Sequence, residues 1–303
     1  MLDILHEFTL RGGKRIRPAL CYYAYQCFRA DRLDAVLQAS LACELLETSL
    51  LIHDDIMDEA STRRGGMTVH RIYEQVALGK GLSFGQARRY GESMAMLVGT
   101  VASQLGLQVL QECNFPVEVR DQAAQLYREV LIDEQYGQAM DMQPRQAGEY
   151  NGAYALELAR NKTARYTTEL PLMLGCTLAE RRDMLPAFQE IGRDIGIAFQ
   201  IKDDILGVFG REEVTGKSVS DDIREGKKTL LVSCTWEDLS PADRAVLART
   251  VGNANASDED VAEVRKLMRV SGALAKAEAE VVRLLNAARA QLDSLGLRSE
   301  GRE

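Results

Sequence analysis

Hydrophobic residues recur every three to four positions along most of the chain, whereas strict alternation of hydrophobic and polar residues is almost absent. The first spacing is typical of an amphipathic α-helix and the second of a half-buried strand. We therefore predict an all-α protein, a bundle of many helices. The periodic stretches predict helices at about 33–60, 87–114, 117–143, 152–176, 180–210, 220–236, 240–252 and 258–294.

Nothing in the composition divides the chain into parts. Its 303 residues are 46% hydrophobic and 27% charged, which suits a globular protein with a sizeable core. No stretch rich in Pro, Gly or Ser separates two halves, and no longer segment repeats. We therefore predict one domain over residues 1–303. Its last helix, 258–294, begins at the cap Ser257-Asp258-Glu259-Asp260 and is interpreted as scaffold.

The formal net charge of −8 argues against binding to nucleic acid, because a sequence-independent grip on phosphates needs an excess of cations. No charged-then-apolar leader and no run of about 18 apolar residues is found, so we expect a cytoplasmic protein without a transmembrane segment. The six cysteines lack zinc-ligand spacing and are expected to be reduced core residues: Cys21, Cys27, Cys43, Cys113, Cys176 and Cys234.

A first acidic cluster ends the helix predicted at 33–60. It reads His53-Asp54-Asp55-Ile56-Met57-Asp58-Glu59 and follows an apolar run. Asp54 and Asp58 are one turn apart and share a helix face. Carboxylates so placed can hold a hard divalent cation such as Mg²⁺ through oxygen atoms. Taken alone, the cluster could equally be a solvated acidic helix end.

A second aspartate pair, Asp203-Asp204, lies within the apolar helix predicted at 180–210. Charge in such a setting is costly unless it is paired or binds a metal. Two helices that each carry an aspartate pair would most simply face one another across a metal-filled cavity. A ferritin-like di-metal site is the rival interpretation, but it needs Glu-x-x-His pairs, which this chain lacks.

Cations that could hold phosphate occur near both clusters. Gly12 to Pro18 reads GGKRIRP and combines flexible backbone with three cations. Arg63 and Arg64 directly follow the first cluster, where guanidinium groups can reach a phosphate that the metals already hold. In the second half, further cations are supplied by Lys162, Lys202, Lys217, Lys227 and Lys228. Each could be ordinary surface charge if it stood alone.

Together these residues resemble the trans-isoprenyl diphosphate synthase (polyprenyl synthetase) family. Its motifs occur here in order: Gly12 to Pro18, Asp54-Asp55-Asp58, Arg63-Arg64-Gly65, Gly137-Gln138-Asp141, Lys162-Thr163, Phe199-Gln200-Asp203-Asp204, Gly216-Lys217 and Asp222 to Thr229. The resemblance implies an isoprenoid synthase-type bundle of about ten or more helices around a central cavity, usually homodimeric. It also implies a magnesium-dependent prenyltransferase that condenses isopentenyl diphosphate with an allylic diphosphate.

The resemblance assigns roles to individual residues. It implies that Asp54, Asp58 and Asp203 bind Mg²⁺. The catalytic set that it implies is Asp54, Asp55, Asp58, Arg63, Lys162, Gln200, Asp203 and Lys217. The substrate-binding set is Lys14, Arg17, Glu47, Arg63, Arg64, Lys162, Thr163, Gln200, Lys202, Lys217 and Lys227, in which Lys14, Arg17 and Arg64 would hold isopentenyl diphosphate.

The chain departs from the family pattern at several positions. Glu47 stands where members often have His or Gln, and a carboxylate there would repel diphosphate unless it is protonated or turned away. Gly207 replaces the third aspartate of the late motif, and Thr100 replaces the aspartate that often follows Gly99. Short-chain members usually carry an aromatic residue five positions before the first aspartate.

Here that position is Ser49, followed by Leu50, so we expect a product of geranylgeranyl length or longer. Two other functions stay open: a class I terpene cyclase, and a non-catalytic partner subunit of a hetero-oligomeric prenyl synthase. The cations for a second diphosphate argue against the cyclase, and two intact aspartate pairs argue against an inactive subunit.

Overall fold

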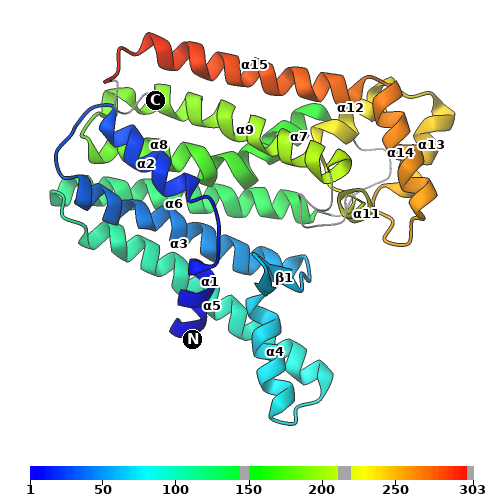
Figure 1. Ribbon diagram of the computed structural model, residues 1–303, viewed down its shortest axis with the longest axis horizontal. Helices are drawn as coiled ribbons and strands as arrows, with labels where there is room; N and C mark the ends of the chain where they lie inside the picture. The colour runs from blue at the N-terminus through cyan, green and yellow to red at the C-terminus, as the bar shows by residue number, and fades with distance from the viewer. Residues whose placement is uncertain (144–149, 211–219, 299–303) are drawn as a thin grey trace. The chain divides into compact units, whose positions relative to one another are not determined.

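The computed structural model describes residues 1–143, 150–210 and 220–298 (Figure 1). More than ten helices and one two-stranded hairpin make up this part of the chain, so the all-α prediction is confirmed. The residues form two compact units, and each is described here by itself. The first contains residues 1–131, 170–185 and 297–303, and the second contains 132–169 and 186–296. The single domain over 1–303 stays a prediction.

The first unit is built around two long antiparallel neighbours, α3 (Leu33–Met57) and α5 (Phe84–Glu112), which pack along one another (Figure 1). Small residues on α5 permit this close approach: a Cβ atom at Gly106 would lie 3.2 Å from the Ala42 carbonyl oxygen. The other elements of the unit are α1 (Leu2–Leu10), α2 (Ile16–Gln26), β1 (Thr62–Arg63), β2 (Gly66–Met67), α4 (Val69–Gly79), the first part of α6 (Val117–Met142), α8 (Leu170–Leu178) and η2 (Arg182–Met184).

The second unit packs several helices around an apolar core that includes Ile201, Leu247 and Met268. Its elements are the end of α6, α7 (Gly152–Ala159), the π-helical segment η1 (Arg160–Glu169), α9 (Leu185–Phe209), α11 (Asp221–Glu225), α12 (Leu230–Asp238), α13 (Pro241–Thr250), α14 (Asp258–Val270) and α15 (Ala273–Ser294). Ser257 caps α14 and Asp260 completes a capping box, as predicted.

Three boundaries differ from the predicted helices. The stretch 258–294 is two helices, because Gly272 adopts a left-handed conformation at φ 77° and ends the run. The stretch 220–236 breaks at Gly226, which has φ 75°. The stretch 152–176 is divided by the ten π-helical residues of η1. The helices α1, α2 and α4 were not predicted, and each is short, with 9 to 11 residues.

All six cysteines are free thiols, and all but Cys234 are buried. By length and average hydropathy alone, α3 and α5 would be able to cross a membrane, but core helices of soluble proteins also meet this criterion. The absence of a transmembrane segment therefore stays a prediction.

Candidate active site

The first acidic cluster occupies the C-terminal end of α3. Asp54 and Asp55 lie in its last turn, and Asp58 follows as the C-cap with its backbone N–H donating to the Asp54 carbonyl at 2.8 Å. Asp55 is buried, whereas the Asp54 side chain retains 24% of its exposure. The cluster thus offers carboxylates on two adjacent faces of the helix end.

Arg63 binds this cluster. Its Nε donates to Asp55 Oδ1 at 2.7 Å, and its Nη2 lies 3.7 Å from Asp54 Oδ2. Burial alone would lower the pKa of Arg63, but the charges of Asp55, Asp54 and Asp58 outweigh burial and raise that pKa above its ordinary value. Arg63 is therefore a fixed cation beside the predicted metal ligands.

The hairpin between β1 and β2 directs Arg64 away from the aspartates that Arg63 binds. Arg63 pairs with Gly66 across the two strands, and the turn residues Arg64 and Gly65 have φ values of 51° and 75°. Two positive φ values in a two-residue loop are typical of a type I′ turn. The Arg64 guanidinium extends toward α3 one to two turns before the aspartates, where Nη2 lies 3.1 Å from Glu47 Oε1.

Arg17 reaches the same glutamate from α2, with 2.7 Å between its Nη1 and Glu47 Oε1. The structure therefore brings together three of the four residues predicted around isopentenyl diphosphate. The fourth, Lys14, lies exposed in the adjoining loop, and no ion pair of Lys14 is found among the residues that the structure describes. A Cβ atom at Gly13 would lie 3.6 Å from the Arg64 guanidinium, so this loop backbone lines the arginine.

Glu47 lies seven residues before Asp54, which places it about 10 Å away along the same face of α3 at 1.5 Å per residue. Ser49 and Leu50, between them in sequence, are both buried. Arg15 is the third cation of the predicted phosphate-binding loop, and its partner Glu44 was not predicted to belong to the site. Arg15 forms an ion pair with Glu44 and donates to the Thr9 carbonyl at 2.8 Å.

The Gly99-Thr100 departure has a local explanation in the first unit. A Cβ atom at Gly99 would lie 2.6 Å from His53 Nε2, so the histidine that precedes the aspartates requires a glycine there. The Thr100 hydroxyl donates to the Met96 carbonyl at 2.9 Å, within its own helix. Thr100 thus contributes no charge beside the early cluster.

In the second unit, one face of α9 carries the late motif. Gly192 and Gly196 let η1 pack against the α9 backbone: a Cβ atom at Gly192 would lie 2.7 Å from Glu169 Cα. One turn later, Gln200 accepts a hydrogen bond from Thr163 at 2.7 Å and donates to Asp204 at 2.7 Å. The glycines therefore bring the predicted Thr163 and Gln200 into a single hydrogen-bonded chain.

Asp203 and Asp204 have different environments. Asp203 and the preceding Lys202 are exposed, whereas Asp204 is buried. Burial raises the pKa of Asp204 to about 7; the hydrogen bond from Gln200 opposes this rise and the charge of Asp222 adds to it. Asp203 is thus the more accessible of the two carboxylates, and its role as a metal ligand stays a prediction.

Gly207 lies directly beneath a carboxylate from another helix. A Cβ atom at this position would overlap Oδ2 of Asp222, whose Cγ would be 2.8 Å away. Asp222 in turn forms an ion pair with Lys227. Burial alone would lower the pKa of Lys227, but Asp222 outweighs it and raises that pKa. Asp222 therefore occupies the space that a third aspartate of the late motif would fill.

Lys162 and Lys228 both bind groups at the C-terminal end of α6. Lys162 Nζ lies 2.5 Å from Asp141 Oδ2, and a glycine at 137 allows the Lys162 backbone to approach α6. Lys228 donates to the carbonyl oxygens of Met140 at 2.8 Å and Gln143 at 2.9 Å, which satisfies helix-end acceptors. Lys217 and Gly216 lie outside the described residues.

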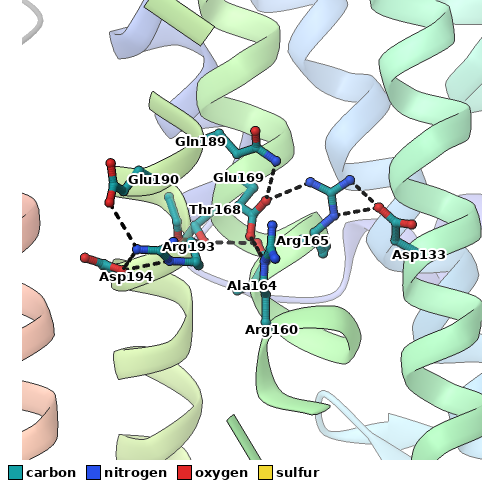
Figure 2. A network of polar contacts seen from close by, with 11 residues as sticks. Asp133, Arg160, Ala164, Arg165, Thr168, Glu169, Gln189, Glu190, Arg193 and Asp194 are labelled. Carbon is teal, nitrogen blue, oxygen red and sulfur yellow. Dashed lines mark hydrogen bonds and ion pairs between the residues drawn. The ribbon is translucent and has the colours of Figure 1, made fainter. Parts of the chain in front are cut away.

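A network of charged residues fixes η1 (Figure 2). Glu169 is fully buried and accepts hydrogen bonds from Arg165 at 2.7 Å and Arg160 at 3.2 Å. Arg165 also donates through Nε to Asp133 at 2.8 Å, which ties η1 to α6. π-Helical turns are frequent at functional sites. This one contains the predicted site residues Lys162 and Thr163.

The comparison with known proteins agrees with this arrangement. The chain matches the polyprenyl synthetase family over residues 1–268 and belongs to that family. A short chain isoprenyl diphosphate synthase of Methanocaldococcus jannaschii is 32% identical over 271 residues, which cover 88% of this chain and 75% of that protein. A (2E,6E)-farnesyl diphosphate synthase of Mycobacterium tuberculosis is 33% identical over 277 residues, 89% of this chain and 71% of that protein.

Among solved structures, a geranylgeranyl pyrophosphate synthase from Corynebacterium glutamicum, complexed with isoprenyl diphosphate and magnesium, is similar to this chain with a TM-score of 0.90. The two share 33% sequence identity, and the match covers 99% of this chain and 86% of that one. The predicted family and the isoprenoid synthase-type fold are thereby confirmed.

Proposed function

We propose that this member of the polyprenyl synthetase family is a magnesium-dependent trans-prenyltransferase. It joins isopentenyl diphosphate head-to-tail to an allylic diphosphate and releases diphosphate. The observation that carries the proposal is the divergence of two consecutive arginines. Arg63 serves the early aspartates, whereas Arg64 joins Arg17 about 10 Å back along α3 at 1.5 Å per residue. Two separate anion sites suit a reaction of two diphosphates, and a terpene cyclase needs one.

The donor chemistry fits Mg²⁺. Asp54, Asp58 and Asp203 offer carboxylate oxygens, which magnesium prefers. Within the described parts of the chain, no three acidic, histidine or cysteine side chains converge into a complete metal site. Mg²⁺ is commonly held by one or two carboxylates and completed by substrate phosphates. When bound, Mg²⁺ would stabilise the negative charge that grows on the departing diphosphate.

The chain's own cations support the same step. Arg63 and Lys227 have raised pKa values and are charged at neutral pH, so they can stabilise the leaving diphosphate without a proton change. Lys162 is oriented by Asp141 for the same purpose. The double bond of isopentenyl diphosphate then attacks the allylic cation, and the released diphosphate takes the proton that is lost. Apolar side chains must exclude water from this cation.

We also propose a product of geranylgeranyl length or longer. Ser49 is 1% exposed, and its small side chain stands where the resemblance places an aromatic residue in short-chain members. The substitution Ser49→Phe should shorten the product, whereas the matched control Ser49→Ala should not.

The test is a product assay with radiolabelled isopentenyl diphosphate, Mg²⁺ and dimethylallyl, geranyl or farnesyl diphosphate in turn. Chain lengths are resolved after dephosphorylation. Geranylgeranyl or longer products support the whole proposal, and elongation that stops at farnesyl refutes the interpretation of Ser49 alone. Folded protein that is inactive with every primer would refute the transferase and favour a partner subunit or a cyclase.

A homodimer in the cytoplasm completes the proposal. Leu37 and Leu41 on α3 and Leu97 on α5 are each about half exposed, at 54%, 48% and 53%. Exposed apolar side chains on neighbouring helices suit an interface with a second copy. Light scattering on the purified protein should give twice the mass of the chain.

A further inference from the structure

Glu47 binds both arginines that the proposed function assigns to isopentenyl diphosphate. Its Oε1 lies 2.7 Å from Arg17 Nη1 and 3.1 Å from Arg64 Nη2. The three side chains retain only 13–14% of their exposure. Ion pairs that are this far buried are screened weakly by salt and water. The chain thus places its own anion where the substrate's anion would bind.

A second glutamate adds to this effect. Glu44 lies one turn earlier on α3, forms an ion pair with Arg15, and comes within 3.8 Å of Arg64 Nη1. Three arginines and two glutamates leave this cluster with one net positive charge. A diphosphate therefore meets cations that are already largely neutralised.

The arginines do not depend on Glu47 alone for their placement. Arg17 belongs to the first turn of α2, and Arg64 is held by the type I′ turn, with the Gly13 backbone alongside. Replacing the glutamate by glutamine would keep the size of the side chain and one oxygen acceptor, remove the charge, and exchange the other oxygen for an NH₂ donor. The cations would stay in place and lose their competing anion.

We propose that Glu47 is an internal counter-ion that competes with the diphosphate of isopentenyl diphosphate for Arg17 and Arg64, and so sets the affinity of this site. The inference rests on the proposed function in assigning a diphosphate to these arginines. Binding at this site is then an exchange of one anion for another. Neutralising Glu47 should tighten it.

The first experiment measures binding without catalysis. Inorganic diphosphate is titrated calorimetrically into the full chain in the presence of a chelator, so that magnesium-dependent binding does not contribute. Glu47→Gln should bind about tenfold tighter than the wild type, which corresponds to about 1.4 kcal/mol. The matched control Glu180→Gln removes the same charge from an exposed ion pair with Arg29 and should leave the affinity for diphosphate unchanged. The double variant Glu47→Gln/Arg17→Gln should bind diphosphate no more tightly than the wild type.

The second experiment measures turnover. For Glu47→Gln, the KM for isopentenyl diphosphate should fall by about tenfold, more than any change in kcat. A folded Glu47→Gln protein that binds diphosphate equally or more weakly would overturn the inference, because it would show that Glu47 orients the arginines. Absence of turnover in all variants would refute the proposed function, while the calorimetry would still decide the role of Glu47.

Discussion

The substitution Asp204→Asn tests the cost of burying the late aspartate pair. Burial, the largest cause, raises the pKa of Asp204 to about 7 from an ordinary value of 3.8. At about 1.36 kcal/mol for each pH unit, this difference bounds the cost of the charged side chain at about 4 kcal/mol. Asparagine carries no charge and keeps the oxygen that accepts the hydrogen bond from Gln200.

The pH dependence has a definite sign. Between pH 3.8 and about 7, the folded protein holds a proton on Asp204 that the unfolded chain has released. The free energy of unfolding therefore falls as the pH rises through this window. Below it both states are protonated, and above it the full cost of the charge is present. The free energy of unfolding of Asp204→Asn should exceed that of the wild type by an amount that grows through this window and becomes constant above pH 7.

The assay is urea unfolding followed by circular dichroism between pH 4 and 9, without magnesium. The expected difference between Asp204→Asn and the wild type rises with pH by up to about 4 kcal/mol. The exposed carboxylate of Asp121 provides a control, because Asp121→Asn should show little change over the same range. A difference for Asp204→Asn that does not vary with pH would refute the reasoning.

Three further substitutions test other contacts. Gly207→Asp should destabilise the protein by about 2 kcal/mol, because its side chain would overlap Asp222, and Gly207→Asp/Asp222→Ala should recover most of the loss in the same assay. Lys228→Met should cost about 2 kcal/mol by leaving the carbonyls at the end of α6 without donors, with unfolding midpoints as the measurement. Glu169→Ala should cost about 3 kcal/mol by breaking a buried pair, and a loss below 1 kcal/mol would contradict its role in holding η1.

The long helices could be predicted because their apolar residues repeat over many turns, as α3 and α15 illustrate. The break at Gly272 could also have been anticipated from a glycine inside a helical pattern. The π-helical segment η1 could not, because its wider turns depend on partners far away in the sequence. Asp133 is 32 residues from Arg165, and no local pattern indicates that Arg165 binds it together with the nearby Glu169.

The candidate site was predictable in its residues but less so in its pairings. The spacing of Asp54 and Asp58 predicted a shared helix face, and Glu47 was identified as an unusual charge. That one glutamate would bind both Arg17 and Arg64 depends on the turn geometry of the hairpin. Such side-chain pairings arise from tertiary structure and leave no periodic signal in the chain.

The short hairpin after α3 makes the length of this segment as important as its composition. Arg63 ends a strand and Arg64 begins the type I′ turn, so one arginine faces the aspartates and the next faces Glu47. Inserting or deleting a single residue between Asp58 and Arg63 would shift the hairpin relative to α3 and move both guanidinium groups away from their partners. Evolution and engineering should therefore tolerate exchanges of residues in this loop far better than any change in their number.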